Sequence, residues 1–201
     1  KTETTPGNTV VGDDIVVTSI NPATDSEEQD IYNIRIDRVT PSDVSTLKSF
    51  GLHSEDFFSV DGYTTDATFK TVDGDKNSMV AELPWSIYQH ADFLETLGAS
   101  FETTDASSRV YLLDETNDTL NLLVEYDDDD YDASTDAIDG TDHKTTDKDP
   151  ITIVVLSERT WVNVDTNGTV ADWEDNIKAN TPADSLKYTE YKLYVDQKGA
   201  E

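Results

Sequence analysis

The sequence has no cysteine among its 201 residues. Disulfide bonds, thiolate nucleophiles and cysteine-ligated zinc or iron–sulfur sites are therefore excluded. It also lacks an apolar run near the roughly 18 residues that indicate a membrane-spanning helix. We find no signal peptide, but the chain begins with Lys1 rather than methionine. We therefore expect a mature chain that was processed after export.

Catalytic motifs are missing as well. The three histidines, His53, His90 and His143, form neither a His-x-x-x-His nor a Glu-x-x-His pattern. The sequence contains no Gly-x-Ser-x-Gly nucleophile elbow and no phosphate-binding glycine loop. With 43 acidic residues available, any single pair of carboxylates chosen for glycoside hydrolysis is uninformative. We predict that the protein is not an enzyme.

Basic residues are scarce. The 14 lysines and arginines accompany 43 acidic residues, which gives a formal net charge of −29. A field of this sign repels nucleic acids and anionic membranes, attracts cations, and destabilises a compact state at low ionic strength. We therefore expect surroundings rich in salt or divalent cations, such as those of a halophilic or marine surface protein. Hydrophobic residues make up 35%, which is low for a globular protein but high for a disordered one.

Strand patterns dominate the remaining sequence. Residues 109–113 and 119–126 flank a polar turn and predict a hairpin, while the continuous apolar stretch 151–156 predicts a buried strand. Further strands are expected at 31–38, 57–60, 63–72, 79–83, 99–103, 160–164 and 188–195. Capping residues and helical spacing predict short helices at 40–50 and 86–97, and 169–180 fits a short helix or a strand followed by a loop.

These elements predict a mainly β protein, a β-sandwich or jelly-roll-like fold with two or three short helices in the connections. Residues 1–20 are expected to form an N-terminal tether that carries a strand. Residues 21–201 are expected to form a single β-sandwich domain with an acidic loop at 127–149. Loops of this length are usually functional or disordered.

Two acidic stretches have the alternating oxygen spacing of a calcium loop. The predicted ligands are Asp73, Asp75, Asn77 and Glu82 in the first stretch, and Asp128, Asp130, Asp132 and Asp139 in the second. Ser78 and Pro84 stand where the full helix-loop-helix signature needs glycine and glutamate. A polar hairpin loop and a solvated charge run explain the same residues. Calcium is the cofactor that we predict.

Modification and recognition sites are also suggested. The sequons at Asn117 and Asn167 both fall in expected turns and predict glycosylation of a surface protein. The three tryptophans, Trp85, Trp161 and Trp173, are expected to pack against the core. Exposed tryptophans would instead form a sugar-stacking platform of the kind found in carbohydrate-binding modules.

The stretch Thr9–Ile20 is β-capable and follows a polar start, so it either pairs within its own sheet or completes the open edge of a neighbouring copy. The residues that we expect in this assembly strand are Val10, Val11, Ile15 and Val17. In general character the chain resembles the extracellular β-sandwich subunits of archaeal and bacterial surface filaments, the cannula-, thread- and camelysin-like proteins. This resemblance implies homopolymerisation by strand donation, with calcium in some cases.

We therefore predict an extracellular or cell-surface structural subunit that assembles with copies of itself into a filament, tube or surface layer. Divalent cations are its expected partners, without nucleic acid and without membrane insertion. Two alternatives fit the same features. One is a calcium-dependent carbohydrate-binding or adhesin module, and the other is a capsid or decoration protein of a virus with a halophilic or marine host.

Overall fold

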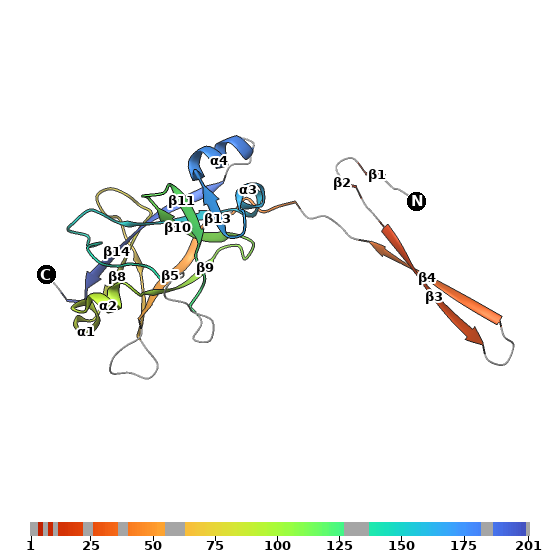
Figure 1. Cartoon of the computed structure of the whole chain (residues 1–201), viewed down its shortest axis with the longest axis horizontal. Helices are drawn as coiled ribbons and strands as arrows, with labels where there is room; N and C mark the ends of the chain where they lie inside the picture. The colour runs from red at the N-terminus through yellow and green to blue at the C-terminus, as the bar shows by residue number, and fades with distance from the viewer. Residues whose placement is uncertain are drawn as a thin grey trace. The chain divides into compact units, whose positions relative to one another are not determined.

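The computed structural model describes residues 4–5, 8–9, 12–21, 26–35, 40–54, 63–126, 137–181 and 187–199 (Figure 1). The chain divides into two compact units, Lys1–Pro41 and Ser42–Glu201. Each unit is described by itself below. In the described residues, no helix has the length and apolar character needed to cross a membrane.

The N-terminal unit contains two antiparallel strand pairs. Two-residue strands β1 (Thr4–Thr5) and β2 (Asn8–Thr9) pair with each other. The longer strands β3 (Gly12–Asn21) and β4 (Ser26–Arg35) form ten residue pairs, and we call this β3–β4 pair the ribbon. Residues 31–35 of the strand expected at 31–38 are thus the second half of β4, and residues 36–38 lie outside the described residues. The N-terminal unit ends at Pro41, whereas the tether was expected over residues 1–20.

The larger unit is built around two sheets in its described residues. The seven-stranded sheet has, in spatial order, β13 (Thr169–Ala171), β11 (Thr119–Leu122), β10 (Arg109–Asp114), β12 (Ile151–Leu156), β14 (Tyr188–Gln197), β8 (Ser78–Leu83) and β7 (Thr68–Phe69). Its neighbouring strands are antiparallel except β14 and β8, which are parallel. The three-stranded antiparallel sheet has the order β6 (Tyr63–Asp66), β5 (Leu47–Ser54) and β9 (Gly98–Thr103).

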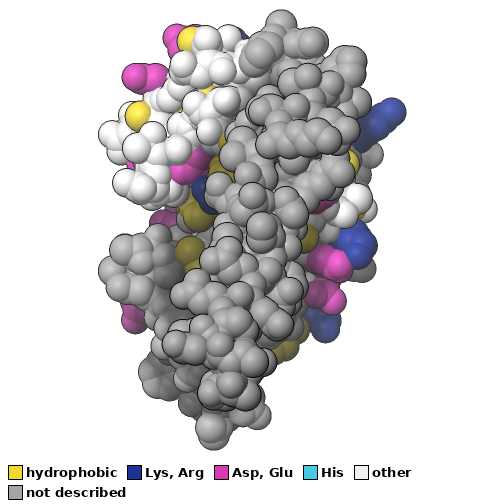
Figure 2. Space-filling view, turned by 90° about the vertical axis from the view of Figure 1, so that its right-hand side faces the viewer, with side chains coloured by type: hydrophobic (Ala, Val, Ile, Leu, Met, Phe, Trp, Pro, Cys, Tyr) yellow, Lys and Arg dark blue, Asp and Glu magenta, His cyan; other side chains and the backbone are white. Residues whose placement is uncertain are grey.

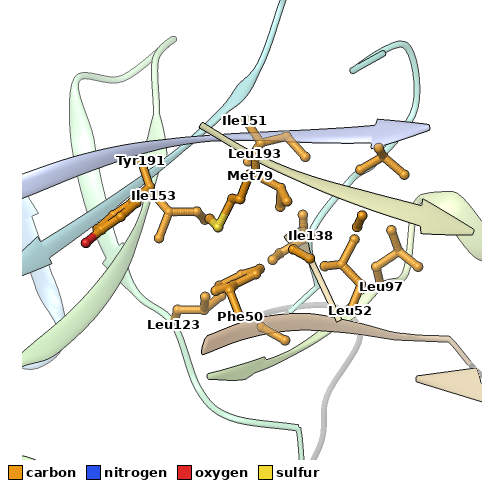
Figure 3. Close-up of a cluster of buried hydrophobic side chains, with 14 of the residues drawn as sticks. Phe50, Leu52, Met79, Leu97, Leu123, Ile138, Ile151, Ile153, Tyr191 and Leu193 are labelled. Carbon is orange, nitrogen blue, oxygen red and sulfur yellow. The ribbon is translucent and has the colours of Figure 1, made fainter. Parts of the chain in front are cut away.

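The main hydrophobic core lies between these two sheets. Phe50 and Leu52 of β5 pack with Ile153 of β12 and Leu193 of β14, and all four side chains are at most 1% exposed. Figure 3 shows Phe50 and Leu52 on one side of this core and Leu193 on the other, with Ile138 between them. Two sheets that bury their facing surfaces in this way form a sandwich. The predicted mainly β, sandwich-like fold is confirmed.

A second core covers the opposite face of the seven-stranded sheet. Helices α3 (Glu158–Val164) and α4 (Trp173–Asn180) supply apolar side chains to it. The members of this core are Tyr111, Leu120, Val154, Leu156, Val164, Val170, Trp173 and Ile177. Neighbouring residues of a strand point to opposite faces. Strand β12 therefore alternates between the two cores and is buried along its whole length.

Three expected elements differ from the structure. Residues 47–54 form strand β5 where we predicted a helix over 40–50. A register irregularity between Leu47 and Ser49 places Leu47 and Phe50 in the same core although they are three residues apart. Because a β-bulge inserts one extra residue, a bulged strand has the spacing of a helix at that point. This spacing misled the prediction.

Residues 160–164, predicted as a strand, belong to helix α3. Its buried side chains, Thr160 and Val164, are four residues apart, as one face of a helix requires. The helix expected over 86–97 consists of two single turns, α1 (Trp85–Tyr88) and α2 (Ala91–Leu94). The extended backbone of His90 separates them. The other expected helix, within 169–180, is α4, preceded by β13.

Candidate functional site

The first predicted calcium loop is a tight hairpin turn between β7 and β8. Val72 and Asp75 bridge each other, while Asp73 and Gly74 between them have positive φ angles of 50° and 88°. This geometry is favoured by an Asp-Gly pair in a two-residue hairpin loop. The Asp75 carboxylate accepts a hydrogen bond from the Asn77 backbone amide (2.8 Å), and Asp73 Oδ2 lies 3.0 Å from Lys148 Nζ. Each of these two carboxylates therefore has a partner within the chain at one of its oxygens, and calcium binding at this loop stays a prediction.

The other predicted ligands are dispersed or lie outside the described residues. Glu82 is exposed on β8, in register with Asp196 of β14. Asp139 is exposed, and its Oδ1 accepts hydrogen bonds from the Thr141 amide (2.9 Å) and hydroxyl (2.6 Å). Asp128, Asp130 and Asp132 belong to the undescribed stretch 127–136. Within the described residues, no group of three or more acidic or histidine side chains is placed to hold a metal ion.

The described part of the acidic loop is attached to the core by Ile138. Its side chain is fully buried, and its backbone exchanges two hydrogen bonds with Leu97 (2.7 and 3.2 Å). The Gly140 amide donates to the Leu94 carbonyl (2.7 Å), and the Val195 amide donates to the His143 carbonyl (2.8 Å). Ile138 is the one large apolar residue in the described part of this loop, residues 137–149, and its burial fixes that part to the larger unit.

Both sequons lie in exposed turns of the larger unit. Asn117 is in the β10–β11 hairpin turn, where its side-chain amide donates to Asp114 Oδ2 (2.7 Å). This hydrogen bond is the main reason that the pKa of Asp114 lies below its usual value. Asn167 is exposed with a φ of 56°. Glycosylation of the two asparagines stays a prediction.

A buried ionic network joins α3 to the seven-stranded sheet. Asp165, whose side chain is 3% exposed, pairs with Arg109 and accepts a hydrogen bond from the Tyr111 hydroxyl (2.6 Å). The Arg109 guanidinium lies over the Trp161 ring, 3.6 Å from its centroid. Burial favours a higher pKa for Asp165, but hydrogen bonds from Tyr111, from the Gly168 amide and from Arg109 outweigh it, so the pKa is lowered. The network is a structural element of the second core.

The chain enters the larger unit through a segment that is anchored from its first residue. The Ser42 amide donates to Glu158 Oε2 (3.0 Å), and the Arg159 amide donates to the Ser42 carbonyl (3.1 Å). Asp43 Oδ1 forms an ion pair with Arg159 Nε at 2.9 Å. These contacts attach the segment to the start of α3.

The anchoring continues into β5. The Thr104 amide donates to the Thr46 carbonyl (2.8 Å), and the Leu47 amide donates to the Tyr191 hydroxyl (3.0 Å). We call residues 42–47 the anchor segment. Its hydrogen bonds therefore reach α3, β14 and the β9–β10 connection.

Ion pairs compensate only a small part of the negative charge. Five ion pairs are present among the described residues. Lys48–Glu102 joins the neighbouring strands β5 and β9, and Lys178–Glu174 joins successive turns of α4. Figure 2 shows acidic side chains, in magenta, beside basic ones, in dark blue, on the described surface. Since the whole chain has 43 acidic and 14 basic residues, most carboxylates need solvent cations for neutralisation.

Comparisons with protein-family models, with curated proteins and with solved structures found no match. Functional conclusions therefore depend on the features of this chain. The predicted assembly strand Thr9–Ile20 overlaps β2 and β3, and the structure pairs β3 with β4. Val10 and Val11 lie outside the described residues, whereas Ile15 and Val17 are ribbon positions. The sequence analysis predicted part of the second strand, within 31–38, but neither its pairing with β3 nor the anchor segment.

Proposed function

We propose that the protein is a structural subunit that assembles with copies of itself into an extracellular filament, tube or surface layer, by adding its N-terminal ribbon to a sheet edge of another copy. One observation carries this proposal. The ribbon belongs to a compact unit of its own, while the larger unit buries two cores with its own strands and helices. The larger unit therefore does not need the ribbon to complete its fold.

The ribbon has features of a segment that requires a partner. A two-stranded hairpin is marginally stable at best in water. The register places Ile15 opposite Tyr32 and Val16 opposite Ile31. Because successive residues of a strand belong to opposite faces, each face of the ribbon has an apolar pair. In the described residues β3 and β4 pair only with each other, so a further strand would add both burial and backbone hydrogen bonds.

We propose β6 as the acceptor edge. It is an outer strand of the three-stranded sheet, and its residues alternate between half-buried and exposed. The other outer strand of that sheet, β9, is already bridged to Glu125 at Ala99. The outer strands of the seven-stranded sheet, β7 and β13, have only two and three residues. Among the described outer strands of the larger unit, β6 is the longest that has a side without a bridge.

The contacts of the anchor segment suit a connection that carries tension between subunits. An assembly joined through N-terminal ribbons transmits tension through the residues that connect each ribbon to its own larger unit. In this chain that connection begins at Ser42, where hydrogen bonds and the Asp43–Arg159 ion pair attach it to α3. Multiple short-range attachments of this kind resist peeling better than a free linker.

Charge sets the conditions for assembly. The first 41 residues contain eight acidic and three basic residues, and the remainder is also strongly acidic. Copies therefore repel one another at low ionic strength. Salt screens this repulsion, and calcium bound by the Asp-rich stretches, including Asp128, Asp130 and Asp132, would neutralise it locally. Association should strengthen with both.

Deletion of residues 1–41 tests the proposal. We expect light scattering to detect large species of the full chain in high salt or with millimolar calcium, and a folded monomer for the deletion variant. Equal assembly by the variant would exclude a role for the ribbon. A full chain that stays monomeric in all of these conditions would exclude self-assembly.

Introduced cysteines test the acceptor edge. Because the chain has no cysteine, every disulfide formed by single-cysteine variants joins two introduced cysteines, and mass labelling of one variant distinguishes the heterodimer from the homodimers. We expect a mixture of Thr18→Cys in the ribbon and Thr64→Cys in β6 to form a cross-linked heterodimer on oxidation. Lys178→Cys, on the exposed face of α4, is the matched control in place of Thr64→Cys. Cross-linking to position 178 as efficient as that to position 64 would contradict β6 as the acceptor.

A further inference from the structure

The turn between α3 and β13 contains the only Asn-Gly pair of the sequence, Asn167-Gly168. Thr166 and Thr169 bridge each other on either side of this pair, through backbone hydrogen bonds of 2.9 and 3.3 Å. Asn167 and Gly168 have φ angles of 56° and 85°, and a two-residue type I′ turn needs positive φ at both of its central residues. Asn167 is exposed, so this turn presents the pair to solvent.

An Asn-Gly pair has a chemical reactivity of its own. The backbone nitrogen of Gly168 can lose its proton and attack the side-chain carbonyl carbon of Asn167. A bond forms between this nitrogen and Asn167 Cγ, the bond from Cγ to the side-chain nitrogen breaks, and that nitrogen takes up the proton and leaves as ammonia. Water then opens the succinimide ring at either carbonyl, which leaves aspartate or isoaspartate. Glycine favours this attack because it has no Cβ beside the nitrogen.

The attacking nitrogen is held by Asp165. The Gly168 amide donates a hydrogen bond to Asp165 Oδ1 at 2.7 Å. The Asp165 side chain is 3% exposed, and its lowered pKa keeps it ionised at neutral pH. On the other side of the residue, the Gly168 carbonyl accepts a hydrogen bond from the Leu122 amide at 2.7 Å. The peptide groups before and after Gly168 are therefore both fixed.

This hydrogen bond opposes the attack in two ways. The N–H group that donates to Asp165 must rotate away before the nitrogen can bond to Asn167 Cγ, so the bond to a charged acceptor is lost on the way to the ring. Loss of the amide proton also leaves a negative charge on a nitrogen that lies 2.7 Å from a carboxylate oxygen. Two like charges at this distance repel each other strongly where water is largely excluded.

The two oxygens of the Asp165 carboxylate have different partners. Oδ1 accepts from the Gly168 amide, whereas Oδ2 accepts from the Tyr111 hydroxyl at 2.6 Å and pairs with Arg109. The contact with the turn and the contacts of the buried ionic network can therefore be removed separately by substitution.

We propose that Asn167-Gly168 is a deamidation site and that Asp165 suppresses the reaction by holding the Gly168 amide. Asp165 is a positioning residue in this role, because it acts through the Gly168 nitrogen. Isoaspartate would add a backbone methylene to the turn bridged by Thr166 and Thr169, directly before Val170 of the second core. Suppression therefore preserves the connection between α3 and β13. This inference does not depend on the proposed assembly.

Peptide mapping by mass spectrometry tests the inference on the full chain, produced without glycosylation and incubated in mildly alkaline buffer. The fractions of asparagine, aspartate and isoaspartate at position 167 are measured over time. We expect the folded wild type to react at least about tenfold more slowly than the same chain unfolded in guanidinium chloride. Asp165→Ala should react about tenfold faster than the folded wild type, which corresponds to about 1.4 kcal/mol of activation free energy.

Tyr111→Phe is the matched control. It removes the hydroxyl that donates to Asp165 Oδ2 and leaves the bond between Oδ1 and the Gly168 amide. We expect it to lower the free energy of unfolding and yet to deamidate at the wild-type rate. Equal acceleration in Tyr111→Phe and Asp165→Ala would show that general loosening of the network controls the reaction, and would overturn the proposal.

Two further results would also overturn it: a folded wild type that reacts as fast as the unfolded chain, or an Asp165→Ala variant that reacts at the wild-type rate. Thermal unfolding followed by circular dichroism verifies that each variant is folded at the incubation temperature. Asp165→Asn, which removes the charge but retains an oxygen that can accept from the Gly168 amide, takes the place of Asp165→Ala in these comparisons if the alanine variant does not fold.

Discussion

Strand β12 and strand β3 are both rich in β-branched apolar residues, but they have different surroundings. Strand β12 lies between β10 and β14, and both of its faces are covered, by the three-stranded sheet and by α3 and α4. Strand β3 pairs with β4 in a separate two-stranded ribbon. The apolar residues of β12 therefore stabilise the fold of one molecule. Those of β3 are available, in our proposal, to stabilise contacts between molecules.

The largest expected effect is a charge introduced into β12. Val154 is fully buried in the second core. Val154→Asp places an unpaired carboxylate in this core and should lower the free energy of unfolding by about 4–5 kcal/mol or more. Urea denaturation followed by tryptophan fluorescence measures this change, because all three tryptophans belong to the larger unit. A loss below about 0.5 kcal/mol, the usual surface range, would mean that β12 is not doubly covered.

An intermediate effect is expected at the buried ionic network. Asp165→Asn weakens the pairing with Arg109 and the hydrogen bond from Tyr111, and should cost about 1–3 kcal/mol at neutral pH. Because the folded-state pKa of Asp165 is lowered, its contribution is complete above the unfolded value, about 3.9, and is lost as the pH falls through the folded value. The difference between the wild type and the variant should therefore shrink below about pH 4.

Unfolding curves of the wild type and of Asp165→Asn, at neutral pH and at acid pH, measure whether the stability difference shrinks on acidification. Asp139→Asn is a suitable control, since Asp139 is exposed and its carboxylate accepts hydrogen bonds from Thr141, two residues along the chain. A stability difference that grows on acidification would contradict the lowered pKa of Asp165.

The smallest expected effect on stability is the matched change in the ribbon. Val16→Asp should alter the fluorescence-detected unfolding of the larger unit by no more than about 0.5 kcal/mol, the usual range for changes outside a core. It should nevertheless reduce assembly, because Val16 and its register partner Ile31 form one of the ribbon's apolar pairs. Light scattering in high salt measures assembly. A large loss of stability without any loss of assembly would reverse the roles assigned to β3 and β12.

Local sequence patterns predicted many of the strands of the larger unit. The β10–β11 hairpin, the buried strand β12 and the closing strand β14 follow from turn residues and from apolar runs, which are short-range signals. Strand β5 and helix α3 did not follow. The bulge at Leu47 imitates helical spacing, and the buried face of α3 exists only because the sheet packs against it. Such tertiary effects override local propensity.

The candidate sites show the same limit. The β-capable stretch at Thr9–Ile20 was visible in the sequence, but its pairing with β4 was not, because Asp and Glu are frequent in residues 25–30. A cleft at one end of the seven-stranded sheet is lined by Glu82, Lys144 and Asp196, which are more than fifty residues apart from one another. No spacing rule connects such positions. Only the parallel pairing of β8 with β14 brings two of them into register.

The position of β14 in the seven-stranded sheet has a consequence for biosynthesis. This strand lies between β12 and β8, yet it is the last strand described in the chain. Until Tyr188–Gln197 emerges from the ribosome, β12 and β8 have no strand to join them. A nascent chain of this protein therefore cannot complete the seven-stranded sheet until β14 has been synthesised, so the early strands of the sheet must wait for a late one.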